Sequence, residues 1–99
     1  MHAADSRLWR QMQKTLTSAD YSRLISFLVA AREKAGIRQH ALAEALDVQQ
    51  SFIAKYEAGQ RRLDVIEFIA ISKALGADPL KLLRDFLAGK TPAPPRKRG

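Results

Sequence analysis

Residues 39–57 read QHALAEALDVQQSFIAKYE, and this stretch decides the fold that we expect for the whole chain. Apolar residues recur at helical spacing in both of its halves, which predicts two short helices at about residues 39–46 and 50–57. The segment Leu46-Asp47-Val48 lies between them as a tight turn. Two helices this short cannot bury their apolar faces against each other alone, so the flanking chain must supply a scaffold.

The two short helices have distinct inward and outward faces. The first is expected to bury Leu42, Ala43 and Leu46, and the second is expected to bury Ile53 and Tyr56. The face of the second helix that remains is mostly polar and consists of Gln49, Gln50, Ser51, Ala54 and Lys55. In the turn, we expect Asp47 to adopt a left-handed backbone conformation, which aspartate tolerates better than most residues. Val48 is expected to anchor the turn in the core.

Capping signals predict three flanking helices. Each begins with a side chain that can accept hydrogen bonds from the free N–H groups of the first helical turn, followed by an acid or a proline. The three beginnings are Thr17-x-x-Asp20, for a helix at about residues 18–35, then Asp64-x-x-Glu67, and finally Asp78-Pro79. Glycines that can close a helix follow at positions 36, 76 and 89.

The last two helices differ in how their apolar residues are spread. The helix after Asp64 is expected to face the core with Ile66, Ile69, Ala70 and Leu75. The final helix is apolar around much of its circumference, through Leu80, Leu82, Leu83, Phe86 and Leu87. It therefore either completes the core of a small domain or meets a second subunit.

Size, charge and composition narrow the classes of protein. A chain of 99 residues is one domain, and 17 basic against 10 acidic residues give a net charge of +7. The last nine residues contribute +3 of this through Arg96, Lys97 and Arg98, so the total is weak evidence for nucleic-acid binding. The absence of cysteine excludes disulfides and thiolate metal sites. The chain does not begin with a secretory signal, and no apolar run approaches the ~18 residues of a membrane span, so we expect no membrane partner.

The residues and their spacing resemble the Cro/cI-type helix-turn-helix family, also called the XRE family, over about residues 21–87. The resemblance is carried by Arg32, Gly36-Ile37-Arg38-Gln39, Leu42-Ala43, Leu46-Asp47-Val48, Gln50-Ser51-Phe52-Ile53 and Lys55-Tyr56-Glu57-Ala58-Gly59. It implies an all-α, lambda-repressor-like domain of five helices. The chain departs from the family where Arg38 and Gln49 stand at helix-capping positions, where Asp47 replaces the usual glycine, and at His40.

The residue pattern, together with the resemblance over its middle part, predicts three regions in the chain. Residues 1–17 are an N-terminal extension, in which Leu8, Met12 and Trp9 could belong to an additional helix at about residues 5–16. Residues 18–89 are the helix-turn-helix DNA-binding domain. Residues 90–99 are expected to be a disordered, basic, proline-stiffened tail.

The family pattern implies that the first turns of the helix at residues 50–57 read bases in the major groove. Carried over by position, the base-reading residues are Gln50, Ser51 and Lys55. The amide of glutamine matches the donor and acceptor of adenine, and the ammonium of lysine can donate to guanine. Without the family pattern, glutamines on an exposed helix would be interpreted as merely solvated.

Two further groups of residues have implied roles. The candidates for phosphate binding are Gln39, Gln60, Arg61 and Arg62. Gln39 matches a phosphate-contacting family position, whereas the three residues after Gly59 could equally form a solvated basic loop. Arg32 and Glu57 match a family pair that forms a salt bridge, so we expect them to fix the angle of the second short helix.

We therefore predict a sequence-specific regulator of transcription that binds double-stranded DNA, most simply a homodimeric repressor associated with the nucleoid in the cytoplasm. Two copies would read half-sites about 34 Å apart, with the dimer interface on the last helix or on the N-terminal segment. One alternative is a protein-interaction module, such as an antitoxin that binds a partner protein as well as DNA. Another is non-specific binding of nucleic acid through the basic tail.

Enzymatic activity is not expected from this sequence. It contains no nucleophile elbow, phosphate-cradling glycine loop or paired-carboxylate pattern. Its histidines, His2 and His40, share no helical face with acids at metal-ligand spacing. We accordingly expect neither a cofactor nor a metal ion.

Overall fold

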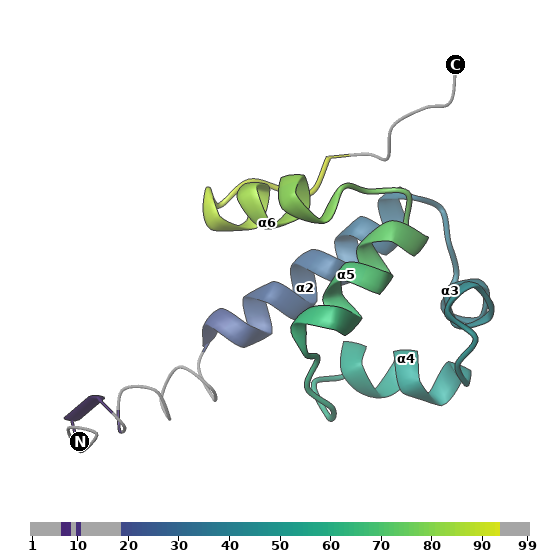
Figure 1. The fold of residues 1–99 in the computed structure, drawn as a ribbon, viewed down its shortest axis with the longest axis horizontal. Helices are drawn as coiled ribbons and strands as arrows, with labels where there is room; N and C mark the ends of the chain where they lie inside the picture. Colours follow the sequence, from purple (N-terminus) through teal and green to yellow (C-terminus); the bar gives the residue numbers. More distant parts are fainter. Residues whose placement is uncertain (1–6, 9, 11–18, 94–99) are drawn as a thin grey trace.

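The computed structural model describes residues 7, 8, 10 and 19–93. Over residues 19–93 it contains five helices and no strand, which confirms the predicted all-α fold. The helices are α2 (Ala19–Lys34), α3 (Gln39–Leu46), α4 (Gln50–Glu57), α5 (Val65–Ala74) and α6 (Pro79–Leu87). α3 packs on α4 and α5, α4 also packs on α2, and α6 packs on α5. In Figure 1, α4 lies at the lower edge of the domain and α6 at the upper edge.

All five described helices contribute apolar side chains to the core. Leu28 of α2, Leu42 of α3, and Ile53 and Tyr56 of α4 are completely buried, and Ile71 of α5 is almost so. Burying an aliphatic side chain of this size contributes about 1.5–3 kcal/mol relative to leaving it exposed. The helix-turn-helix unit of α3 and α4 is therefore held on α2 and α5 by Leu42, Ile53 and Tyr56, which the sequence predicted to face inward, together with Leu28 and Ile71.

The helix boundaries follow local chemistry that could be predicted. The backbone N–H of Glu67 donates to Asp64 Oδ1 (2.7 Å), and the N–H of Asp64 donates to Glu67 Oε1 (2.9 Å), which completes the expected capping box. Asp47 has φ 56° and ψ 46°, the left-handed conformation that ends α3. Arg38 and Gln49 make no capping hydrogen bond with their side chains, in line with their poor capping chemistry.

The prediction that three side chains lie in the core is wrong. Ile66 is 73% exposed, Ala70 is also exposed, and Val48 is 39% exposed. α5 instead turns Ile71 and Ser72 inward, and the hydroxyl of Ser72 donates to the carbonyl of Phe68 (2.8 Å). A serine that satisfies its own hydrogen bond can replace an apolar residue in the core, which rotates the buried face away from the one that the apolar pattern indicated.

The turn holds itself through its backbone, so the side chain of Val48 is not needed as an anchor. The N–H of Val48 donates to the carbonyl of Ala43 (3.0 Å), and the N–H of Asp47 donates to that of Glu44 (3.1 Å). These two bonds satisfy carbonyls at the end of α3. The valine side chain is then left partly in solvent.

The two ends of the chain are described only in part. Of the expected N-terminal helix, Arg7, Leu8 and Arg10 are described and are helical, whereas Thr17 and the rest of the extension lie outside the described residues. At the other end Pro92 is buried, and Lys34 Nζ donates to its carbonyl (2.8 Å). Among the described helices, none is both long and apolar enough to cross a membrane.

Candidate nucleic-acid interface

The structure brings the three predicted base-reading residues onto the outer side of α4. Gln50, Ser51 and Lys55 are all exposed. On the opposite side of the same helix, Ile53 and Tyr56 have no exposed surface. Burial raises the pKa of Tyr56, so its phenol stays neutral. The eight-residue helix is thus anchored along one side and free along the other.

The far end of α4 is fixed by the ion pair between Arg32 and Glu57. Arg32 Nε lies 2.6 Å from Glu57 Oε2, and its Nη2 lies 3.0 Å from Oε1, so the guanidinium and the carboxylate meet as a two-pronged pair. The side chains are only 12% and 7% exposed. The hydrogen bond with Glu57 raises the pKa of Arg32, against the opposing effect of burial. Arg32 also donates to the carbonyl of Ile37 (2.9 Å), which ties in the segment before α3.

Gln39 connects this ion pair to the start of α4. Its Nε2 donates to Glu57 Oε1 (2.9 Å), and its Oε1 accepts a hydrogen bond from Gln50 Nε2 (3.4 Å). Gln39, which the sequence suggested as a phosphate-binding residue, therefore orients Gln50 through its Oε1 atom. The N–H groups of the first turn of α3 remain as donors for an anion at this position.

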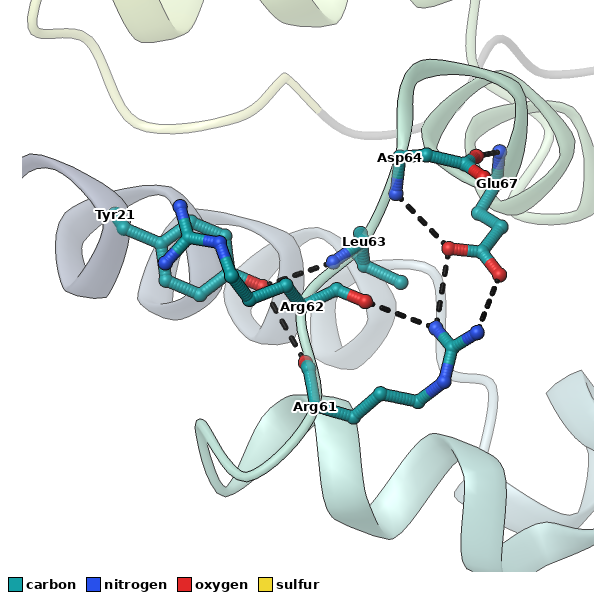
Figure 2. A network of polar contacts seen from close by, with 6 residues as sticks. All are labelled: Tyr21, Arg61, Arg62, Leu63, Asp64 and Glu67. Carbon is teal, nitrogen blue, oxygen red and sulfur yellow. Dashed lines mark hydrogen bonds and ion pairs between the residues drawn. The ribbon is translucent and has the colours of Figure 1, made fainter. Parts of the chain in front are cut away.

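Arg61 lies in a polar network between α4 and α5 (Figure 2). Its Nη1 and Nη2 lie 3.1 and 2.8 Å from the two carboxylate oxygens of Glu67. Nη1 also donates to the carbonyl of Arg62 (2.9 Å), and Cζ lies 4.5 Å from the centre of the Phe52 ring. The charge of this predicted phosphate-binding residue is therefore paired within the protein.

Arg62 and Gln60 occupy the same loop in different ways. The guanidinium of Arg62 lies 4.0 Å above the centre of the Tyr21 ring, which is a cation–π contact. The hydroxyl of Tyr21 accepts from the N–H of Leu63 (3.1 Å) and donates to the carbonyl of Arg61 (3.4 Å) (Figure 2). Gln60 is exposed. Tyr21 of α2 thus fixes the backbone of the loop from which these side chains extend.

The ion pair between Glu67 and Arg61 should make the thermal stability of the protein depend on pH in the acid range. Hydrogen bonds from Arg61 and from the N–H of Asp64 lower the pKa of Glu67 below its usual 4.5. A carboxyl whose pKa is depressed on folding stabilises the protein above its unfolded pKa, and this contribution is lost as the pH falls through the folded pKa. We expect Glu67→Gln to melt below the wild type at pH 7, with the difference shrinking as the pH falls below 4.5 and through the lowered pKa of Glu67. A difference in Tm that stays constant across an acid titration, measured by thermal denaturation, would contradict the assigned ionic role.

The described residues contain no group of three or more side chains able to hold a metal ion. His40, the histidine among them, is exposed on α3.

Comparison with known proteins agrees with this geometry. The helix-turn-helix family model matches residues 28–82, from the middle of α2 to the first half of α6. A solved structure, an XRE-family like protein from Pseudomonas syringae pv. tomato str. DC3000, is 44% identical, with a TM-score of 0.72. The alignment covers 82% of this chain and 98% of that one. The chain belongs to the XRE family of helix-turn-helix proteins. No curated protein matches the sequence.

As an XRE-family protein, the chain is a DNA-binding protein of the transcription-regulator class. The candidate interface also depends on residues that the sequence did not single out for this role. Tyr21, Phe52 and Glu67 form the contacts that hold the loop between α4 and α5. The capping box at Asp64 and Glu67 was the one available signal, because it places a carboxylate within a helical turn of the basic loop.

Proposed function

We propose that this XRE-family protein is a sequence-specific repressor that binds double-stranded DNA as a homodimer and reads the major groove with α4. The observation that carries the proposal is the contrast between the two sides of α4. Ile53 and Tyr56 are fully buried, whereas Gln50, Ser51 and Lys55 are exposed on a helix whose last residue is held by an ion pair. A helix presented in this way fits the width of the major groove.

Each exposed residue has a chemical role in this proposal. Gln50 would pair with the N6 and N7 groups of adenine, Lys55 would donate to guanine O6 and N7, and Ser51 could pair with several base edges. Gln50 would meet the base in a defined orientation, because it is already hydrogen-bonded to Gln39 (3.4 Å). Phosphate contacts from the start of α3 and from Gln60 and Arg62 would set the register on the duplex without reading sequence.

Dimerisation through α6 is supported by an apolar stripe on its outer side. Leu80, Leu83 and Leu87 are 69%, 41% and 72% exposed and follow one another at helical spacing. Such a stripe is typical of an association surface, and a second copy would bury it. Two copies would place two α4 helices on adjacent turns of the duplex, about 34 Å apart.

Charge on this stripe should separate the subunits. We expect Leu87→Lys to weaken dimerisation at least a hundredfold, on the order of 3 kcal/mol, because an unpaired charge is costly at an apolar interface. Ile66→Lys is the matched control, since Ile66 is 73% exposed on α5 and lies outside the stripe. Sedimentation equilibrium measures both variants. A Leu87→Lys protein that remains as dimeric as the control would remove α6 from the interface.

Selection of bound fragments from the source genome tests the proposed function directly. An enriched inverted repeat, with half-sites about one helical turn apart, is the expected result. Transcription from a promoter that carries the repeat should fall when the protein is present. If no site were enriched and another protein co-purified by binding to α6, the protein-interaction module would be favoured over the repressor.

A further inference from the structure

The charge of Arg61 is paired with that of Glu67. Its fork onto Glu67 uses both carboxylate oxygens, and Oε1 also accepts the N–H of Asp64 (2.9 Å) (Figure 2). A phosphate that took over the Nη1–Nη2 edge of Arg61 would have to break two charged hydrogen bonds. It would then face the carboxylate that it had displaced, at close range and with the same sign of charge.

The same guanidinium lies against the recognition helix. Its Cζ is 4.5 Å from the centre of the Phe52 ring, and that ring lies 5.8 Å from the ring of the buried Tyr56. Phe52 directly follows Ser51 and stands two residues after Gln50. Arg61 therefore touches α4 in its first turn, where the base-reading candidates Gln50 and Ser51 lie.

We infer that Arg61 is a positioning residue and not a phosphate ligand: it clamps the first turn of α4, through Phe52, to the start of α5, through Glu67. Arg32 does the corresponding work at the other end of the helix through Glu57 (2.6 Å). With a guanidinium at each end, the angle at which α4 meets a groove is fixed. The effect on DNA rests on the proposed function, whereas the clamp itself can be measured without DNA.

Two substitutions at position 61 separate a clamp from a phosphate ligand. A lysine keeps the charge and can bind phosphate, but it cannot fork onto a carboxylate or lie flat on a ring. Affinity would be measured against salt concentration, for a duplex carrying the selected site and for a scrambled duplex of equal length. The proteins are the wild type, Arg61→Lys, Arg61→Gln and Glu67→Gln. Lys73→Gln is the control for loss of one positive charge, because Lys73 lies in the last turn of α5.

A clamp predicts that Arg61→Lys and Arg61→Gln behave alike. Both should lower the ratio of selected-site to scrambled affinity by about tenfold, because Gln50 and Ser51 lose their register. Both should keep the salt slope of the Lys73→Gln control. If Arg61 were a phosphate ligand, the slope of log affinity against log salt concentration would be smaller in magnitude by about 0.9 in Arg61→Gln. Arg61→Lys would restore the slope of the wild type. Tighter binding and a steeper slope in Glu67→Gln would likewise overturn the inference, since the acid would then be masking a phosphate site.

Thermal denaturation tests the clamp without DNA. If no duplex bound to the protein, the proposed function would be wrong, but the clamp could still be tested in this way. Arg61→Gln and Glu67→Gln should each lower Tm by about 2–5 °C, as expected for a partly exposed pair in a domain of this size. If the two residues act on each other, the loss of Tm in the double variant should be clearly smaller than the sum of the losses in the two single variants. Additive losses in Tm would show that there is no clamp.

Discussion

Replacing Glu57 with alanine is expected to lower the free energy of unfolding by about 3–5 kcal/mol, because it leaves the charge of Arg32 buried without its partner. Arg32 is 12% exposed and directs two of its nitrogens at Glu57. Gln39 would lose the acceptor of its 2.9 Å hydrogen bond as well, and with it the link that orients Gln50. DNA binding should therefore weaken together with folding. Urea denaturation and duplex titration measure the two effects.

Glu44 provides the control for this experiment. It is an exposed acid on α3, so Glu44→Ala removes the same charge without stranding a buried cation. Its effect on unfolding should stay within about 0.5 kcal/mol. Should Glu57→Ala melt and bind like Glu44→Ala, the ion pair would have no structural role in holding α4.

Ile53→Ala is the second change with a large expected effect. Ile53 has no exposed surface and anchors the inner side of α4, so truncation leaves a cavity and costs about 2–5 kcal/mol. Ile66→Ala deletes the same atoms from a side chain that is 73% exposed, and it should cost no more than about 0.5 kcal/mol. Chemical denaturation of the pair measures the difference. Equal losses at the two positions would mean that α4 is not anchored through Ile53.

The fold could be predicted where local chemistry decides it. The capping box at Asp64 and the left-handed Asp47 depend on residues close in sequence, and both appear in the structure. The orientation of α5 depends on packing between helices, and there the apolar pattern placed Ile66 inward although it is exposed. Ser72 explains the difference, since its hydroxyl bonds within its own helix and leaves an inward position open to a polar residue.

The candidate site could be predicted in outline but not in its couplings. The pattern of buried Ile53 and Tyr56 was enough to expect Gln50, Ser51 and Lys55 on the free side of α4. That these three read bases remains a prediction. The contacts of Gln39 and Arg61 could not be predicted, because each joins residues from different helices and depends on how those helices pack.

Base reading by α4 can be tested through the binding-site preference of Gln50→Ala, compared with that of the wild type in a selection from random duplexes. If the exposed side of α4 reads bases, the variant should lose its preference at one base pair of each half-site, worth about 1–3 kcal/mol, and keep it elsewhere. Gln60→Ala, in the loop after α4, should leave the preference intact at every position, since a phosphate contact carries no sequence information. A Gln50→Ala protein that selects the same sites as the wild type, with the same discrimination at every position, would contradict the account.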